Sequence, residues 1–386
     1  MENFNFHNPV KILFGKGKMA ELAEQIPLNK KVLITFGGGS IKKNGIYNQV
    51  KESLKNHNTF EFGGIEANPT YEICMQGLEV IKKEKIDFLL SVGGGSVLDG
   101  TKFMAAAADF KGSDPWEILS KNALFETALP IGAVLTLPAT GSEMNGNSVI
   151  SKKATQEKLA FSSPLVLPKF SLLDPEFTYS LPKRQVINGV IDAFVHVMEQ
   201  YMTYPVNSPV QDRFAEGILL TLIEEGRKAI SNDTPNYENR ANIMWAATMA
   251  LNGIISVGVK EDWATHTIGH ELTAFHGLDH AVTLAIVLPG LLTQKKNDRK
   301  VKLLQYGERV FNVTKGNIDE RLDETIAKTE AFFREMGVLT KLSEHNIGGE
   351  TIDRITTRFE KRGMQLIGAQ QDISLNEVGM ILKSRL

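Results

Sequence analysis

Apolar residues along the chain follow two different spacings, and the first is that of alternating strands and helices. Short apolar runs at 31–36, 87–92 and 132–138 each end at a glycine or proline turn. Between them, 47–57 and 70–85 carry apolar residues at helical spacing. Near-continuous apolar strands that alternate with helices are typical of a parallel sheet covered on both faces.

Beyond about residue 182 the spacing becomes that of long helices, and strand-like runs nearly vanish. The helical stretches are 185–202, 211–230, 238–255 and 322–337. A chain of 386 residues is long enough for two domains. We therefore predict an α/β plus all-α fold, with a parallel-sheet domain over 1–181 and an all-helical domain over 182–386.

Two strand-to-helix turns in the first domain share the sequence GGGS. They lie in ITFGGGSIKKNG (34–45) and LSVGGGSVLDG (90–100). Glycines let backbone N–H groups approach a phosphate, and the following helix N-terminus favours negative charge. Leu98 breaks a GxGxxG fingerprint, and Thr101-Lys102 reverses the order that a P-loop requires. The turns predict a bound nucleotide that is not a hydrolysed triphosphate; the alternative is that the glycines only make tight turns.

A third polar turn, LTLPATGSEMNGNSVI (135–150), follows the strand predicted at 132–138. It adds the hydroxyl and amide side chains of Thr136, Thr140 and Asn147. Ligands of open α/β sheets bind at the carboxyl ends of the strands. We therefore expect this turn to line the same nucleotide site.

Composition narrows the class of protein. The 43 basic and 45 acidic residues give a net charge of −2, which does not favour a nucleic-acid or anionic-membrane partner. A single cysteine, Cys74, excludes an intramolecular disulfide. The longest apolar run, 281–292, is far shorter than the roughly 18–20 residues of a membrane span. The N-terminus lacks the pattern of a secretory signal, so we expect a cytoplasmic protein.

The second half concentrates histidines in ATHTIGHELTAFHGLDHA (264–281). His266 and His270 are four residues apart, as are His276 and His280, and the same spacing joins Asp192 to His196 in an otherwise apolar helix. Such pairs share one helix face. An oxygen and nitrogen ligand set without sulfur suits Fe²⁺, Zn²⁺, Mn²⁺ or Ni²⁺. We predict a metal site, although spacing alone leaves open which two histidines of the cluster complete it.

The sequence resembles the iron-containing (group III) alcohol dehydrogenases over nearly its whole length, closest to the branch of NADPH-dependent aldehyde reductases and butanol dehydrogenases. The stretches that carry the resemblance are GGGSVLD (93–99), LPATGSE (137–143), LLDPEFTYSLPKRQVINGVIDAFVHVMEQ (172–200) and WATHTIGHELTAFHGLDHA (263–281). The resemblance implies a dehydroquinate synthase-like fold with an N-terminal Rossmann-like domain that binds the nicotinamide cofactor and a C-terminal helical domain that binds the metal.

The resemblance also implies roles for individual residues. The implied metal ligands are Asp192, His196, His266 and His280, and His270 faces the nicotinamide and substrate as the catalytic residue. The predicted cofactor-binding residues are Gly38, Gly39, Ser40, Asn68, Gly94, Gly95, Ser96, Asp99, Thr136, Thr140, Asn147 and Lys158. One departure is Asp279-His280-Ala281, where many members have Pro-His-Gly. His276 receives no assigned role.

These observations predict a metal-dependent enzyme that transfers hydride between NADP(H) and a primary alcohol or aldehyde, such as butanol or butyraldehyde, with one Fe²⁺ or Zn²⁺. A homodimer is expected from the resemblance alone. Two alternatives stay open. One is a lyase of the dehydroquinate synthase type, which also binds nicotinamide and metal. The other is a metal-dependent hydrolase whose glycine turns are structural.

The first glycine turn predicts a preference for NADP(H). In NAD-binding relatives of this fold an acidic residue near the end of the second strand holds the adenosine ribose. Here the strand at 31–36 runs into Gly37-Gly-Gly-Ser40, and no carboxylate follows until Glu52. A 2′-phosphate would meet backbone N–H groups, the Ser40 hydroxyl and Lys42 or Lys43.

Overall fold

The structure is a computed structural model that describes residues 1–232 and 234–386. It divides into two compact units. The first is made of Met1–Phe6, Ile187–Asp233 and Met249–Leu386, and the second is made of His7–Val186 and Thr234–Thr248. The fold class predicted from the sequence, a parallel-sheet domain followed by a helical one, is confirmed.

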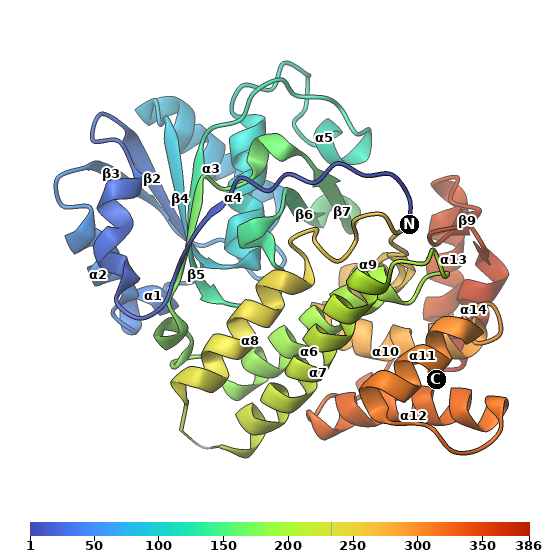
Figure 1. Ribbon diagram of the computed structural model, residues 1–386. Helices are drawn as coiled ribbons and strands as arrows, with labels where there is room; N and C mark the ends of the chain where they lie inside the picture. The colour runs from blue at the N-terminus through green and yellow to red at the C-terminus, as the bar shows by residue number, and fades with distance from the viewer. Residues whose placement is uncertain (233) are drawn as a thin grey trace. The chain divides into compact units, whose positions relative to one another are not determined.

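Six parallel strands form the sheet of the second unit, in the order β1-β8-β5-β4-β2-β3 (Figure 1). The strands are β1 (Lys11–Phe14), β2 (Lys31–Phe36), β3 (Asn58–Phe62), β4 (Phe88–Gly94), β5 (Ile131–Leu137) and β8 (Phe170–Leu173). The α-helices between these strands are α1 (Ser40–Lys43), α2 (Ile46–Ser53), α3 (Tyr71–Glu84), α4 (Gly95–Ala107) and α5 (Glu117–Ser120). An antiparallel hairpin joins β6 (Asn147–Lys152) to β7 (Glu157–Ser162).

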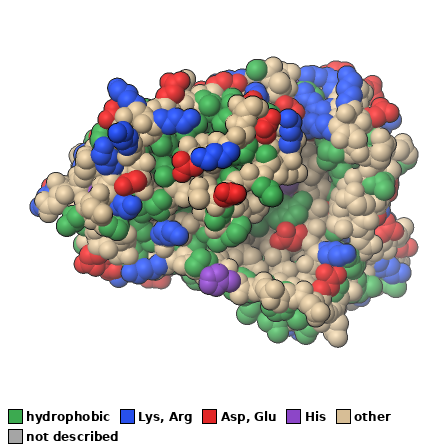
Figure 2. Space-filling view, turned by 90° about the horizontal axis from the view of Figure 1, so that it is seen from above, with side chains coloured by type: hydrophobic (Ala, Val, Ile, Leu, Met, Phe, Trp, Pro, Cys, Tyr) green, Lys and Arg blue, Asp and Glu red, His purple; other side chains and the backbone are tan. Residues whose placement is uncertain are grey.

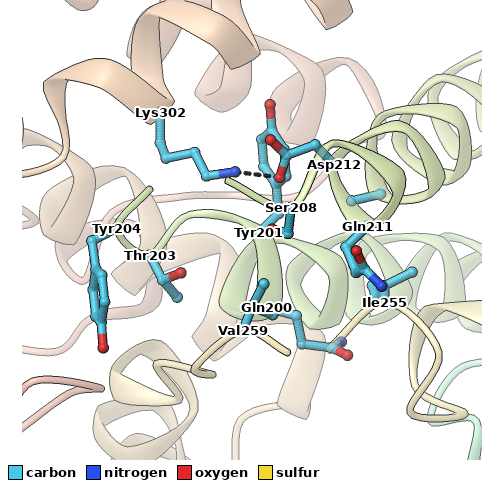
Figure 3. Close-up of a pocket in the computed structure, with 11 residues that line it drawn as sticks. Gln200, Tyr201, Thr203, Tyr204, Ser208, Gln211, Asp212, Ile255, Val259 and Lys302 are labelled. Atoms are coloured by element: carbon cyan, nitrogen blue, oxygen red, sulfur yellow. Dashed lines mark hydrogen bonds and ion pairs between the residues drawn. The ribbon is translucent and has the colours of Figure 1, made fainter. Parts of the chain in front are cut away.

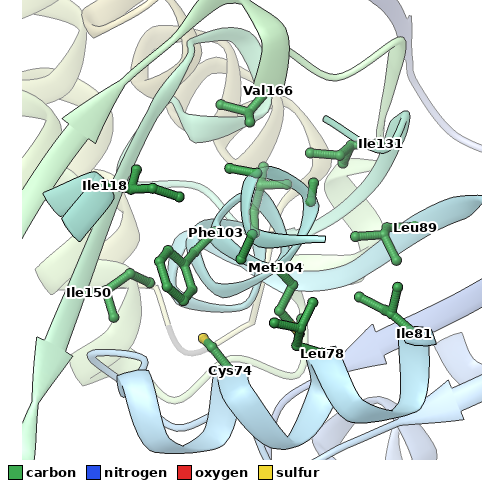
Figure 4. Close-up of a cluster of buried hydrophobic side chains, with 14 of the residues drawn as sticks. Cys74, Leu78, Ile81, Leu89, Phe103, Met104, Ile118, Ile131, Ile150 and Val166 are labelled. Carbon is green, nitrogen blue, oxygen red and sulfur yellow. The ribbon is translucent and has the colours of Figure 1, made fainter. Parts of the chain in front are cut away.

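The continuous apolar runs of the central strands serve two cores, one on each face of the sheet. Leu33 of β2 and Leu89 of β4 pack with α3 and α4 in the cluster drawn in Figure 4. Their neighbours Ile34 and Leu90 pack on the opposite face, with α2. Alternate residues of a strand point to opposite faces, so a strand buried on both sides carries apolar residues on both faces.

The strand order places the two GGGS turns next to each other. From β2 the chain moves outward to β3, and from β4 it moves the other way to β5. Because β2 and β4 are parallel neighbours, with Phe36 opposite Val92, both turns leave the same edge of the sheet. The carboxyl ends of strands at such a change of direction are the usual ligand site of open α/β sheets.

The first unit is built mainly of helices. Its helices are α6 (Lys183–Tyr201), most of which belongs here, α7 (Pro209–Ser231), α9 (Ala264–His276), α10 (His280–Gln294), α11 (Lys300–Phe311), α12 (Ile318–Glu335), α13 (Glu350–Lys361) and α14 (Leu375–Lys383). A two-stranded sheet pairs β9 (Leu366–Ile367) with β10 (Ile373–Ser374). No helix among the described residues is long and apolar enough to cross a membrane.

One long helix belongs to the sheet-containing unit although it lies far along the chain. All but the last two residues of α8 (Tyr237–Ala250) group with the parallel sheet. Met244 packs against Leu135 of β5 and Leu173 of β8, and Trp245 makes an edge contact with Phe14 of β1. The domain boundary near residue 182 stays a prediction.

Candidate metal centre and cofactor turns

Helix α6 supplies the first two candidate ligands from an apolar surrounding. Val190, Ile191 and Phe194 are fully buried, so this stretch of α6 is a core element. Asp192 and His196 lie one turn apart on this helix and are each only 4% exposed. The Nε2 atom of His196 lies 3.6 Å from the Oδ1 atom of Asp192.

Helices α9 and α10 bring two further histidines to the same place. His266 is in the first turn of α9, and its ring centroid lies 4.8 Å from that of His196. Gly277 ends α9 in the left-handed conformation, and the chain turns into α10, whose first residue is His280. The Nε2 atom of His280 lies 3.8 Å from Asp192 Oδ1. The structure therefore brings together all four side chains that the sequence predicts as ligands.

The donor atoms lie close enough together to be candidate ligands of one metal ion. One ligand atom each from Asp192, His196 and His266 lies within 4.8 Å of the others. Two ligands on a tetrahedral ion with bonds of about 2.1 Å stand about 3.4 Å apart, and the separations of 3.6 and 3.8 Å from Asp192 Oδ1 are close to this. Among the described residues Asp192 Oδ1 is buried and accepts no hydrogen bond. A buried carboxylate of this kind fits a cation.

Glu199, one turn beyond His196 on α6, holds His266 in position. Its Oε1 atom accepts a hydrogen bond of 2.9 Å from the His266 backbone N–H and lies 3.2 Å from His266 Nδ1. A carboxylate on Nδ1 leaves Nε2 as the ligand atom. Burial raises the pKa of Glu199 to about 7, while the hydrogen bond from His266 and the charge of Arg299 act in the opposite direction.

The other two histidines of the cluster have different surroundings. The His270 ring centroid lies 5.1 Å from that of His280 and 6.2 Å from that of His266, so His270 borders the predicted ligands. His276 instead makes a hydrogen bond of 2.9 Å with Thr351 Oγ1 in α13. Burial, assisted by the charge of Arg354, lowers the pKa of His276.

In the other unit, the turn between β4 and α4 is shaped for close approach of a ligand. A Cβ atom on Gly95 would lie 2.3 Å from Thr140 Oγ1, so the position requires glycine. Gly94 precedes α4 and has no side chain to cap its first N–H groups. A free helix N-terminus of this length binds phosphate readily.

Three predicted cofactor residues from distant segments meet beside this turn. Lys158 of β7 donates a hydrogen bond of 2.9 Å to the side-chain oxygen of Asn68. The Asn68 backbone N–H lies 3.4 Å from Ser96 Oγ in the first turn of α4. The 6% exposed Lys158 thus adds a positive charge at the N-terminus of α4.

Asp99, in the first half of α4, bonds to the polar turn after β5 and to β6. Its Oδ1 atom accepts a hydrogen bond of 2.7 Å from Ser142, and its Oδ2 atom accepts one of 3.1 Å from the Val149 N–H. Burial raises the pKa of Asp99, and the charge of Lys102 opposes this. A direct contact of Asp99 with the cofactor stays a prediction.

Lys102 is an organising residue that sequence reasoning missed. It is fully buried, and its Nζ atom donates to the backbone carbonyl oxygens of Ser142, Asn145 and Asn147 at 2.7–2.9 Å. These bonds fix the path of the turn that carries Thr140 and leads into β6. Its position three residues after Asp99, on the same face of a helix, was the only feature of the sequence that hinted at this role.

The first glycine turn has free space around Gly38, but Lys42, which follows the turn, contacts other side chains. A Cβ atom on Gly38 would meet no heavy atom within 4 Å, and Gly39 has a φ of 93° before Ser40 begins α1. Lys42 lies over the rings of Phe36 and Tyr47, and its Nζ atom is 3.5 Å from Glu61. Glu61 is on β3, so its proximity was not visible from the local sequence.

A separate pocket lies against the end of α6 (Figure 3). Its two charged residues pair with each other, since Lys302 donates to Asp212, and Lys302 also lies over the Tyr201 ring. The histidine cluster, which gathers several imidazoles around the buried carboxylate of Asp192, is the better candidate for chemistry. Elsewhere, basic and acidic side chains are intermixed over the face seen in Figure 2.

Comparison with known proteins identifies a family that matches nearly the whole chain. Residues 9–175 match the family described as iron-containing alcohol dehydrogenase, and residues 186–385 match the C-terminal part of the Fe-containing alcohol dehydrogenase family. The chain is 56% identical to the NADPH-dependent aldehyde reductase YqhD of Escherichia coli, over 97% of each chain. It is 42% identical to the probable NADH-dependent butanol dehydrogenase 1 of Bacillus subtilis, over 100% of each. A crystal structure of E. coli YqhD superposes with a TM-score of 0.98 at 55% identity, over 100% of this chain and 99% of that one.

Proposed function

Because the chain belongs to the iron-containing alcohol dehydrogenase family, we propose that it is a metal-dependent oxidoreductase that interconverts aldehydes and primary alcohols with NADP(H). The observation that carries the proposal is the convergence of Asp192, His196, His266 and His280. Family membership supplies the reaction class, and this donor set supplies a place for the metal.

A bound divalent ion would supply Lewis acidity toward the carbonyl oxygen, and the nicotinamide would supply the hydride. Asp192, His196, His266 and His280 hold the ion, and Glu199 fixes the tautomer and ring orientation of His266. His270, beside His280, is in place to pass a proton to or from the alcohol oxygen. Iron or zinc suits the nitrogen-rich ligand set, and we propose one such ion per chain.

In the sheet-containing unit, the N-terminal N–H groups of α4 and the Lys158 ammonium bind the cofactor's phosphates. Gly95 keeps this approach open and Thr140 borders it. Gly38, Gly39 and Ser40 receive the adenosine end. The relatives differ in the cofactor that their names give, which is NADPH for the one at 56% identity and NADH for the one at 42%. We place this chain with the NADP(H) users. The homodimer and the cytoplasmic location expected from the sequence stay predictions.

The proposal is tested by metal analysis of protein purified without oxygen, together with absorbance at 340 nm in the presence of butyraldehyde and either NADPH or NADH. We expect about one equivalent of iron or zinc and steady consumption of NADPH, faster than that of NADH. Metal without consumption of either cofactor, with any of a series of aldehydes, would refute the dehydrogenase reaction. In that case release of product from a phosphorylated or ester substrate would favour a lyase or a hydrolase.

A further inference from the structure

A buried ion pair joins the two helices that carry most of the candidate ligands. Asp262 and Arg299 are each 7% exposed, and the Arg299 Nη2 atom donates to Asp262 Oδ2. Asp262 precedes α9, and Arg299 precedes α11. We propose that this pair is a positioning device that sets the spacing of α6 and α9 and thereby the affinity of the metal site. This inference rests on the proposed function.

Arg299 reaches the end of α6. Its Nη1 atom donates a hydrogen bond of 3.0 Å to the backbone oxygen of Met202, the residue after the last one of α6. The carbonyl groups at a helix C-terminus have no partner within the helix, and a cation stabilises them. One guanidinium group therefore binds the end of α6 and Asp262 together, through two different nitrogen atoms.

Asp262 reaches the start of α9 and also holds α6. Its Oδ1 atom accepts a hydrogen bond of 3.0 Å from the Ala264 N–H, at the first residue of α9. Its own N–H donates a hydrogen bond of 2.8 Å to the backbone oxygen of Glu199 on α6. Asp262 is thus bonded to both helices, and the same carboxylate receives Arg299.

Trp263, between Asp262 and Ala264, has an unfavourable backbone conformation that the surrounding contacts must maintain. Trp263 has a φ of 63°, a left-handed conformation that is costly for a bulky side chain. The bond from Ala264 to Asp262 closes the chain around it. The Trp263 ring lies 5.1 Å from the His266 ring and 6.1 Å from the His196 ring. A change at Asp262 is therefore transmitted directly to the candidate ligands.

The positions of the metal-binding atoms tolerate only small displacements of the helices that carry them. A metal site requires its donor atoms to be held within about 0.5 Å of their bonding positions. Asp192 and His196 lie on α6, whereas His266 lies on α9, so their separation depends on how the two helices are held. Glu199 of α6 accepts from His266 of α9, and its backbone oxygen accepts from Asp262, just before α9. Arg299 binds the C-terminal end of α6.

The chain offers a matched control for a buried arginine. Arg385 is 5% exposed and donates to Glu330 at 2.6 Å and to the backbone oxygen of Thr340 at 2.9 Å. Like Arg299 it therefore bonds one carboxylate and one carbonyl oxygen. It ties the C-terminal end of the chain to α12, and neither carries a candidate ligand.

The experiment compares Arg299→Lys with Arg385→Lys in metal-free protein. A lysine retains the charge but cannot bond both partners in the same fork geometry. Zn²⁺ affinity is measured by competition with a chromophoric chelator, and thermal unfolding of the metal-free protein is measured beside it. We expect Arg299→Lys to weaken Zn²⁺ binding by about 10–100-fold, the range for residues that orient metal ligands, and Arg385→Lys to leave it within about twofold of the wild type.

Wild-type Zn²⁺ affinity in Arg299→Lys, whatever its thermal stability, would overturn the inference and leave the proposed function standing. Wild-type protein that binds neither Zn²⁺ nor Fe²⁺ would instead overturn the proposed function, and this inference with it. If Arg299→Lys does not fold, the double variant Arg299→Met/Asp262→Asn removes both buried charges and takes its place. A folded double variant with weakened Zn²⁺ binding supports the inference, and one with unchanged binding refutes it.

Discussion

At the residue scale, His280 is the candidate ligand whose removal should disturb the fold least. Its side chain is 22% exposed, whereas those of His196 and His266 are 6% and 8% exposed. We predict that His280→Ala loses the metal and nearly all activity but remains folded, because one of four ligands is gone and little packing is lost. Metal content and circular dichroism check this. A full equivalent of metal in the folded variant would remove His280 from the ligand set.

His270 lies beside the predicted ligands and should act on the reaction instead. We predict that His270→Ala keeps its metal and loses about 10²–10⁴-fold in kcat, the usual contribution of a general acid or base. Metal content and steady-state kinetics with NADPH and butyraldehyde are measured on the same preparation. Unimpaired turnover with stoichiometric metal would exclude this role.

His276 should affect stability through its proton. Burial lowers its pKa in the folded chain, so the unfolded chain, with a pKa of about 6.5, binds a proton first as the pH falls. The stability contributed by neutral His276 is therefore present above about pH 6.5 and is lost as the pH falls through the lower folded-state pKa. We predict that wild-type protein loses more unfolding free energy than His276→Asn between pH 7.5 and 5. Parallel pH profiles of the two proteins would contradict this.

At the element scale, the proposed function makes the turn between β2 and α1 the place where NADP(H) is distinguished from NAD(H). The space around Gly38 accepts a side chain, since a Cβ atom there meets nothing within 4 Å. We predict that Gly38→Asp lowers kcat/KM for NADPH by about 10-fold or more and affects NADH less, because a carboxylate repels the 2′-phosphate and can accept from ribose hydroxyls.

The matched control is Gly38→Asn, which has nearly the same size without the charge. It should leave the ratio of the two cofactors nearer to that of the wild type. Equal losses with NADPH and NADH in Gly38→Asp would show that the turn does not contact the 2′-phosphate. A wild-type enzyme that favours NADH would refute the assignment and leave the metal site unaffected.

Local sequence patterns were sufficient to predict the strands and turns, but not the contacts between side chains that are distant in the sequence. The strands at 31–36 and 87–92 and the turns after them were predictable because strand periodicity and glycine chemistry act over a few residues. The pairing of Lys42 with Glu61, and of Lys102 with the carbonyl groups of 142–147, depends on register between strands and on crossovers. Such contacts have no local signature in one sequence.

The metal cluster shows the same limit. Spacing within one helix predicts the pairs Asp192/His196 and His266/His270, since residues four apart share a helix face. The same spacing was wrong for His276 and His280, because α9 ends at His276 and α10 begins at His280. It does not show that His280 meets Asp192, because this depends on the turn at Gly277 between α9 and α10. The resemblance to a family supplied that choice. The support from Glu199 and Arg299 was outside what either kind of reasoning gave.

At the scale of the whole molecule, a metal bound at the proposed site should contribute to stability, because the candidate ligands lie on α6, α9 and α10. A ligand that binds only the folded state adds about 4 kcal/mol when its free concentration is about 1,000 times its Kd. We predict that chelation lowers Tm by several degrees and that added Zn²⁺ restores it. The His280→Ala protein, as the control, should show no shift with chelator. An unchanged Tm in wild-type protein that has demonstrably lost its metal would contradict the prediction.

Helix α8 has a consequence for how the protein is made. The sheet-containing unit needs α8 to cover Leu135 and Leu173 and to donate from Thr248 to the buried Glu143, yet residues 187–233 of the other unit are synthesised first. On the ribosome, the sheet therefore stays incomplete, with apolar surface exposed, until about residue 248 has left the exit tunnel. The sheet-containing unit can therefore complete its packing only after residues 187–233 of the other unit have been synthesised.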